Sequence, residues 1–118
     1  MTSNHVTAPR VLFLTSETLG SGDDALGRLL LSKWLDTLAQ FPDALTHAIF
    51  LNGAAKLPIA GSPVLEQLRQ LEALGVELLV CGTCLDHFGV RDQLAVGSVS
   101  NMVAILETLT RAERILQT

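Results

Sequence analysis

The chain lacks the features that mark nucleic-acid-binding and membrane proteins. Its 8 Lys and Arg residues are outnumbered by 12 Asp and Glu residues, which gives a formal net charge of −4. The basic residues are scattered rather than gathered in a patch, so we expect no nucleic-acid partner. No apolar run approaches the ~20 residues that a membrane-spanning helix needs, so we expect no membrane partner either.

The N-terminus lacks an apolar signal core. Residues 1–9 are polar, and we expect them to form a disordered or extended tail. We therefore expect a cytoplasmic protein, in which thiols are kept reduced. The chain has only 2 cysteines, and they are three positions apart. In a reducing compartment such a pair is more often catalytic, redox-active or metal-binding than structural.

What the chain does contain is enough apolar material for one compact domain. Of its 118 residues, 48% are hydrophobic and 17% are charged. The predicted strands are residues 10–15, 46–51, 76–80, 93–96 and 113–117, and the predicted helices are residues 23–41, 63–74, 85–88 and 99–111. Most strands are continuous apolar runs, which is typical of strands covered on both faces. The sequence therefore predicts a single α/β domain over residues 10–118, a three-layer α/β/α sandwich with a mainly parallel sheet of about five strands.

The ends of the predicted helices carry standard signals. Asp23 and Asp24 suit a helix start, Ser62 suits an N-cap before Pro63, and Gly75 suits a helix stop. Helical spacing in residues 23–41 is carried by Leu26, Leu29, Leu30, Trp34, Leu35, Leu38 and Phe41. The side chains expected to face inward from the last helix are Met102, Val103, Ile105, Leu106 and Leu109. That helix has little charge, and we expect it to form a subunit contact.

Both cysteines lie in one motif, Cys81-Gly82-Thr83-Cys84, between a predicted buried strand and a predicted helix. Backbone N–H groups and the helix dipole favour a thiolate in that position. In parallel sheets the loops after the strands meet at one edge, where ligands bind. We therefore expect the loops that begin at Ser16, Asn52 and Cys81 to meet there. The candidate cleft residues are Thr15, Ser16, Gly20, Asn52, Gly82, Thr83, His87 and Arg91.

Several of these candidates have a structural alternative. Asn52 suits either a ligand hydrogen bond or an Asx-type turn. Two interpretations of His87 are open. It supplies a proton or a positive charge beside the thiolate, or it is a solvated residue of the first helical turn. Arg91 suits either thiolate stabilisation or a plain surface position. The loop around Gly20 matches no G-x-G-x-x-G fingerprint and no Walker lysine follows it, so acidic capping of a helix is favoured over nucleotide binding.

The motif itself allows four interpretations. A structural zinc site needs four ligands, and the histidines match no usual spacing. A thioredoxin-like dithiol needs a later cis-proline, but no proline follows Pro63. Thiol-based transfer of sulfur or selenium needs an accessible thiol of low pKa. It does not need a metal or a cofactor. Both cysteines would be inert in the fourth interpretation, in which they are core residues. We expect no metal and no cofactor. A further possibility is a metal site that CGTC motifs from several subunits form together.

Residues 80–101, VCGTCLDHFGVRDQLAVGSVSN, resemble the DsrE/DsrF-like family, and within it the C-terminal domain of the YedF-like selenium-metabolism proteins. The resemblance extends to residues 16–29, 50–52 and 62–80. It implies a DsrE-like fold that assembles as trimers or hexamers. It also implies that Cys81 is the cysteine that carries a persulfide, while Cys84 is specific to the YedF-like branch.

The resemblance implies a sulfur or selenium relay protein, a sulfurtransferase-like carrier, with Cys81 and Cys84 as its reactive residues. YedF-like proteins carry an additional TusA-like domain with a Cys-Pro motif. This chain begins almost at the DsrE-like strand, so we expect a TusA-like carrier as a separate chain, or else the loss of the relay role. The alternative is a non-catalytic module that binds a small ligand or serves assembly, with a structural CGTC loop.

Overall fold

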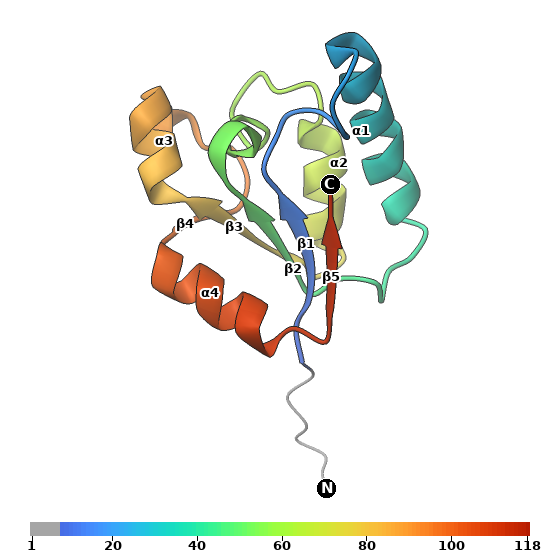
Figure 1. Ribbon diagram of the computed structural model, residues 1–118, viewed down its shortest axis with the longest axis vertical. Coiled ribbons are helices and arrows are strands. Elements are labelled where there is room, and N and C mark those ends of the chain that lie inside the picture. The colour runs from blue at the N-terminus through green and yellow to red at the C-terminus, as the bar shows by residue number, and fades with distance from the viewer. Residues whose placement is uncertain (1–7) are drawn as a thin grey trace, which may run out of the picture.

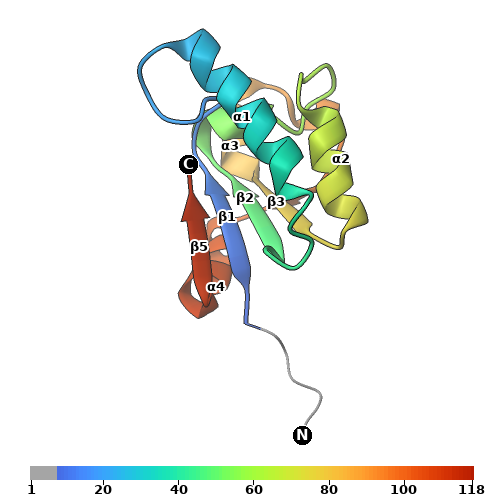
Figure 2. The same ribbon diagram turned by 90° about the vertical axis from the view of Figure 1, so that its right-hand side faces the viewer.

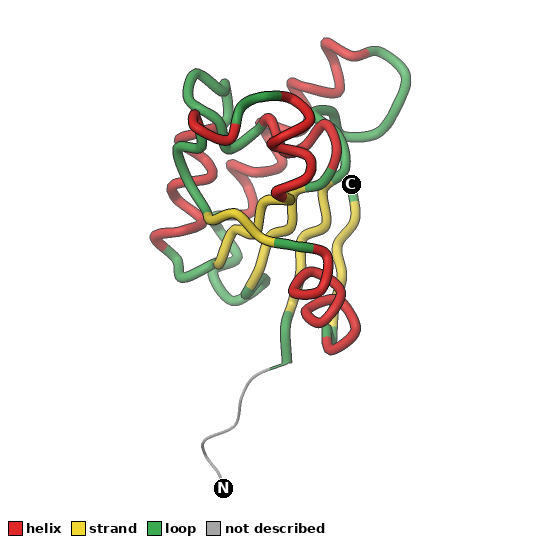
Figure 3. The backbone as a smooth tube through the Cα atoms, turned by 90° about the vertical axis from the view of Figure 1, so that its left-hand side faces the viewer, coloured by secondary structure: helices red, strands yellow, loops and turns green. Residues whose placement is uncertain are grey.

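A computed structural model describes residues 8–118 of the chain (Figure 1). Its sheet has five parallel strands in the order β4-β3-β2-β1-β5. Their bounds are β1 Arg10–Leu14, β2 His47–Phe50, β3 Glu77–Cys81, β4 Ser98–Ser100 and β5 Arg114–Gln117. The predicted tail, residues 1–9, lies outside the described residues except for Ala8 and Pro9. Figure 3 shows the five strands side by side.

The described residues form four α-helices and two short 3₁₀ helices. Their bounds are α1 Asp24–Leu38, α2 Leu65–Ala73, α3 Gly82–Phe88, α4 Met102–Arg111, η1 Asn52–Lys56 and η2 Arg91–Gln93. Helices α1 and α2 cover one face of the sheet and α4 covers the other (Figure 2). The predicted three-layer α/β/α architecture is therefore confirmed, and the sheet is parallel throughout.

The core has two parts, because successive strand residues point to opposite faces. On the α1 and α2 side, Leu12, Phe50 and Leu78 are fully or almost fully buried. On the α4 side, Val11, Ile49 and Cys81 pack with Ile105. Burial of both faces explains why the strands are continuous apolar runs.

Several predicted helix ends are confirmed, and three starts are corrected. The Asp23 carboxylate accepts the N–H of Leu26 at 2.8 Å and caps α1. Gly75, with φ +91°, follows α2 in the left-handed conformation that favours glycine. Ser62 is not the N-cap of α2: its hydroxyl accepts the Val64 N–H at 3.3 Å in a turn, and the helix begins at Leu65.

The second correction is at α3, which begins at Gly82 and not at Leu85. The reason is that the Cys81 sulfur accepts the N–H of Cys84 and so caps the helix three residues earlier. The motif is therefore the last strand residue and the first helical turn, rather than a loop between them. This places Thr83 and Cys84 on a regular helix.

The prediction for residues 93–96 is wrong. Those residues follow η2, and Leu94 forms only an isolated antiparallel bridge to Ile59. The edge strand is β4, Ser98–Ser100, and it pairs with β3 through its backbone. The helix predicted from residue 99 consequently starts at Met102, where the Asn101 side chain accepts the Ala104 N–H at 3.0 Å.

The predicted inward faces of two helices also need correction. In α4, Ile105 is buried and Leu109 is half-buried, but Met102, Val103 and Leu106 are exposed. The apolar positions of α1 that remain exposed are Leu26, Leu29, Leu30 and the following Phe41, whereas Leu31, Leu35 and Leu38 are buried. In both helices one face packs on the sheet, and no described element covers the further apolar side chains.

Candidate functional site

The end of β3 and the start of α3 bring the cysteines to the carboxyl edge of the sheet. Gly82 makes this junction possible, because it is buried against β4. A Cβ at this position would lie 3.0 Å from both Arg91 Nη2 and Val99 Cγ1, and 3.2 Å from the Ser100 carbonyl oxygen. Glycine therefore lets α3 begin in close contact with β4.

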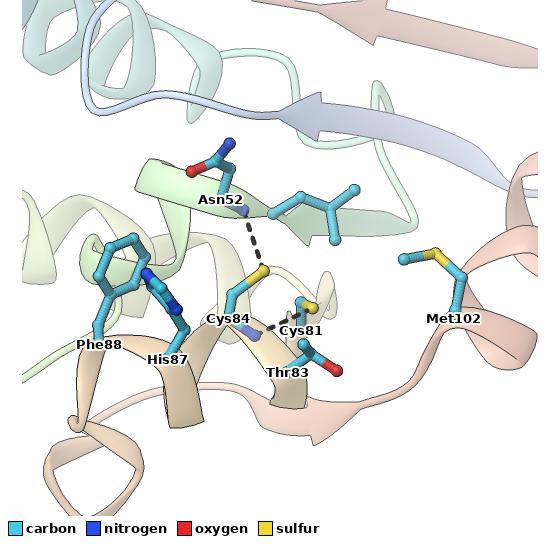
Figure 4. A pocket seen from close by; sticks show the side chains of 8 residues that line it. Asn52, Cys81, Thr83, Cys84, His87, Phe88 and Met102 are labelled. Atoms are coloured by element: carbon cyan, nitrogen blue, oxygen red, sulfur yellow. Dashed lines mark hydrogen bonds between the residues drawn. The ribbon is translucent and has the colours of Figure 1, made fainter.

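The two cysteine sulfurs each accept one backbone hydrogen bond (Figure 4). The Cys84 N–H donates to Cys81 Sγ at 3.4 Å, and the Asn52 N–H donates to Cys84 Sγ at 3.1 Å. Both cysteines are free thiols. Cys81 is 3% exposed and Cys84 is half-buried, so Cys84 is the more accessible of the two.

Asn52 reaches Cys84 because of its backbone conformation. Its φ is +52°, and it is the one non-glycine residue with positive φ in residues 8–118. Asparagine adopts this left-handed conformation more readily than most residues. The turn at the end of β2 thus directs the Asn52 N–H toward the thiol of another element. Asn52 lines the cavity, and its contact with Cys84 is made by the backbone N–H.

The thiols line an open cavity of about 400 Å³. Its walls are formed by Leu51, Asn52, Cys81, Thr83, Cys84, His87, Phe88 and Met102. The structure therefore brings five of the predicted site residues together: both cysteines, Asn52, Thr83 and His87. Leu51, Phe88 and Met102 were missed. Phe88 could have been predicted as a cavity residue, because it lies four positions after Cys84 on one helix and so shares a face with it. Met102 lies on a helix distant in sequence, and no sequence signal identified it as a cavity residue.

Burial and the neighbouring thiol together raise the pKa of Cys84. Desolvation is the largest cause, followed by the hydrogen bond between the two thiols; negative charge on Cys81 adds a smaller effect. The Asn52 N–H acts in the opposite direction and lowers the pKa of Cys84. This direction is opposite to that of the low-pKa thiolate expected for the motif.

One wall of the cavity is held by contacts outside it. Lys56 Nζ lies 4.3 Å from the centre of the Phe88 ring, a cation–π distance, and 3.9 Å from Glu17 Oε2. The His87 ring contacts the edge of Phe88 with ring centres 5.3 Å apart. The loop after β1, η1 and α3 are thereby connected beside the thiols.

Arg91 lies away from the cavity and binds Asp86. Arg91 Nε and Nη2 donate to the two Asp86 carboxylate oxygens at 2.7 and 2.9 Å, and Nη2 also donates to the Gly82 carbonyl at 3.4 Å. This pairing lowers the pKa of Asp86. Arg91 therefore offsets a carboxylate on α3 that would otherwise repel a nearby thiolate. Gly82 lies beneath the site and does not line the cavity.

The remaining candidates lie beside the site rather than in it. Ser16 and Gly20 line a separate cavity of about 550 Å³. Thr15 is half-buried directly after β1. The three loops do meet as predicted, because the Gly53 position packs close to the Ser16 backbone and Asn52 bonds to Cys84.

Across residues 8–118, no three His, Cys, Asp or Glu side chains come together in a group able to hold a metal ion. None of the helices in this part of the chain is long and apolar enough to cross a membrane.

The fold and the site together define a parallel α/β/α domain with a cysteine pair at the carboxyl edge of its sheet. The chain belongs to the DsrE/DsrF-like family, whose model matches residues 43–118. This range includes the whole cysteine cavity. The search for similar sequences among curated proteins found no match.

Two solved structures share the fold. The YchN protein from E. coli is 15% identical with a TM-score of 0.68, over 93% of this chain and 99% of that one. BT1422 from Bacteroides thetaiotaomicron, described as a conserved protein of unknown function, is 18% identical with a TM-score of 0.64, over 92% and 93%. At such low identity these likenesses establish the fold alone. They extend the DsrE-like architecture to β1 and α1, which precede the residues that the family model matches.

Proposed function

We propose that this chain is a sulfur or selenium relay protein, in which Cys81 carries a persulfide-type adduct and passes it to a partner thiol. The observation that most supports this is that both cysteine sulfurs meet in an open cavity at the carboxyl edge of the sheet. Ligands of open α/β sheets bind at this edge. Membership in the DsrE/DsrF-like family is consistent with sulfur relay.

The surroundings of the two cysteines support different roles. Burial and the neighbouring Cys81 thiol raise the pKa of Cys84, which makes it the weaker nucleophile of the pair at neutral pH. Cys81 lies at the end of β3, and its Sγ accepts the Cys84 N–H at the start of α3. We therefore assign the carrier role to Cys81, as the family resemblance implies, and an assisting role to Cys84.

The transfer needs no external oxidant. The Cys81 thiolate attacks the outer sulfur of a donor persulfide, and the S–S bond of the donor breaks with its electron pair on the donor thiolate. An acceptor thiolate then attacks the outer sulfur on Cys81, and Cys81 leaves as a thiolate. Selenium in place of the outer sulfur follows the same steps. The protein is thus a sulfurtransferase-like carrier.

Cys84 provides a second route for release. Its sulfur can attack the inner sulfur of the Cys81 adduct, which forms a Cys81–Cys84 disulfide and expels hydrosulfide. The proton of Cys84 leaves with the expelled sulfur. A dithiol reductant then restores both thiols. This route explains why an assisting thiol lies next to the carrier.

The finer placement of the chain and its partners also belongs to this proposal. The CGTC motif and the residues after it support the YedF-like branch, and hence a role in selenium metabolism. A TusA-like sulfur carrier on a separate chain is the proposed partner. Free thiols in a relay need a reducing compartment, which supports the cytoplasm.

We further propose that the chain forms a homo-oligomer, a trimer or hexamer. Support comes from α4, which leaves Met102, Val103 and Leu106 exposed by 51%, 72% and 51%. Val99, on the neighbouring β4, is also exposed. An apolar surface of this kind is usually covered by a partner, and Met102 connects it to the cysteine cavity.

The relay proposal is tested by loading the reduced protein with a persulfide donor and measuring sulfur released by cyanide. Wild type and Cys84→Ser should be loaded, and Cys81→Ser should not. Thr83→Ser, a neighbouring change that keeps a hydroxyl, should behave as wild type. Equal loading of Cys81→Ser and wild type would reject the proposal.

One observation favours the alternative, a non-catalytic module for small-ligand binding or assembly with a structural CGTC loop. Cys81 is only 3% exposed and also caps α3. In that case Cys81→Ser and Cys84→Ser change the free energy of unfolding or the oligomer size, while no sulfur is loaded on any variant. The loading experiment therefore separates the two functions.

A further inference from the structure

We propose that Cys81, Cys84 and Met102 bind one Cu(I) ion in the cysteine cavity. Three of the eight residues that line this cavity carry sulfur, and they come from the end of β3, from α3 and from α4. The helix α4 is distant in sequence from the CGTC motif, so the fold brings this third sulfur to the pair. This binding function is separate from the relay and does not depend on it.

The lining of the cavity determines which ion it suits. It contains two thiols, a thioether and the imidazole of His87, but no carboxylate. Thiolate and thioether ligands favour soft ions such as Cu(I), whereas Mg²⁺, Ca²⁺ and Mn²⁺ prefer oxygen. Zinc in a structural site takes four ligands from Cys, His, Asp and Glu. No group of even three such residues forms within residues 8–118, and Cu(I) is satisfied by fewer ligands.

Backbone amides support the two thiol ligands. Cys81 Sγ accepts the Cys84 N–H at 3.4 Å, and Cys84 Sγ accepts the Asn52 N–H at 3.1 Å. Such hydrogen bonds orient metal ligands and offset the excess negative charge of two thiolates around a singly charged ion. Each coordinated thiol gives its proton to solvent when the ion binds.

Met102 completes the site from the opposite side. It is the first residue of α4, it is 51% exposed, and in Figure 4 it lies on the far side of the thiols from Phe88. Methionine is unbranched and has three rotatable bonds, so its thioether can move toward an ion held by the thiols. Its half-exposed position means that little packing is lost when it does so.

The test is an anaerobic titration of the reduced full-length protein with Cu(I) held by the coloured chelator bicinchoninate. Wild type should remove one Cu(I) per chain from the chelator, and Cys81→Ser and Cys84→Ser should remove none. Met102→Leu, a substitution at an exposed position, should bind about tenfold more weakly. Val103→Leu is the matched control, because Val103 is exposed on the same helix but does not line the cavity.

Three results would overturn this site. The first is that wild type fails to take Cu(I) from the chelator. The second is that Met102→Leu binds Cu(I) as tightly as wild type does. The third is that wild type unfolded in urea binds Cu(I) as tightly as the folded protein does. Persulfide loading of the copper-free wild type is measured separately by cyanide release. Failure of the copper site is thus distinguishable from failure of the relay.

Discussion

Gly82 and Asn52 place the two sulfurs through their backbones rather than through their side chains. Gly82 lets α3 begin against β4, and the positive φ of Asn52 directs its N–H at Cys84. The side chains of the cysteines are then oriented by amide donors that a substitution elsewhere in the cavity does not remove. The positions of the two reactive sulfurs therefore depend on residues that supply no reactive side chain.

Gly82→Ala should destabilise the protein by about 1–3 kcal/mol, the usual range for overpacking. The added methyl group would press on Arg91, Val99 and the Ser100 backbone at 3.0 to 3.2 Å. Gly53→Ala is the matched control, because the nearest atom to its Cβ is 3.8 Å away. Urea denaturation of both variants measures the difference, and equal free energies of unfolding would contradict this account of Gly82.

The raised pKa of Cys84 predicts its reactivity. The rate of alkylation of Cys84 by iodoacetamide, followed by mass spectrometry of its peptide, should rise with pH through a midpoint above that of an ordinary thiol. In Cys81→Ser this midpoint should fall, because the negative charge and the thiol hydrogen bond of Cys81 are gone. A midpoint that is unchanged by the substitution would show that Cys81 does not influence Cys84.

The same shift has a consequence for stability. The pKa of Cys84 is higher in the folded than in the unfolded chain. The contribution of Cys84 to the free energy of unfolding is therefore fully present below the ordinary thiol pKa. This contribution is lost as the pH rises through the raised pKa of the folded chain. The urea midpoint of wild type should therefore fall more steeply on the alkaline side than that of Cys84→Ser. Parallel curves for the two proteins would contradict the raised pKa.

Among the elements, α3 depends on Cys81 for its start. The Cys81 sulfur caps the helix by accepting the Cys84 N–H. Serine can make the same bond but alanine cannot, so Cys81→Ala should be about 1 kcal/mol less stable than Cys81→Ser. Thermal or urea unfolding of the two variants measures this difference. Equal stability would show that the sulfur does not act as a cap, and a stable Cys81→Ser makes that variant suitable for the loading experiment.

The elements that could be predicted are those with a strong local signal. Continuous apolar runs identified β1, β2 and β3, and Asp23 and Gly75 marked helix ends. The strand β4 gave no such signal, because Ser98–Ser100 is short and polar and is held at the sheet edge by backbone pairing with β3. The start of α3 was missed because cysteine is not a usual N-cap residue.

Within the site, the sequence predicted the residues that the strand-end rule brings together. Cys81 ends β3 and Asn52 lies just after the adjacent parallel strand β2, so their proximity follows from topology. Met102 was missed as a site residue because its position depends on the path of the chain after β4. Periodicity located apolar residues on α4 but not which of them the sheet covers, since that depends on the packing of the whole molecule.

For the whole molecule, the exposed apolar face of α4 predicts self-association. Light scattering during gel filtration should give a mass three or six times the 12.6 kDa of one chain. Val103→Glu should shift the protein toward monomer, because it places a charge at the centre of the proposed contact. Leu26→Glu, at an exposed apolar position of α1 on the other face of the sheet, is the matched control. A monomeric wild type would contradict the proposal.

The most direct test of the relay is to find which cysteine carries the transferred atom. The reduced protein is incubated with a persulfide donor, its remaining thiols are blocked, and its peptides are mapped by mass spectrometry in wild type, Cys81→Ser and Cys84→Ser. The account predicts one additional sulfur on Cys81 in wild type and in Cys84→Ser, and its loss to an added acceptor thiol. An adduct that is absent, or that persists on Cys84 in Cys81→Ser at the wild-type level, would contradict it.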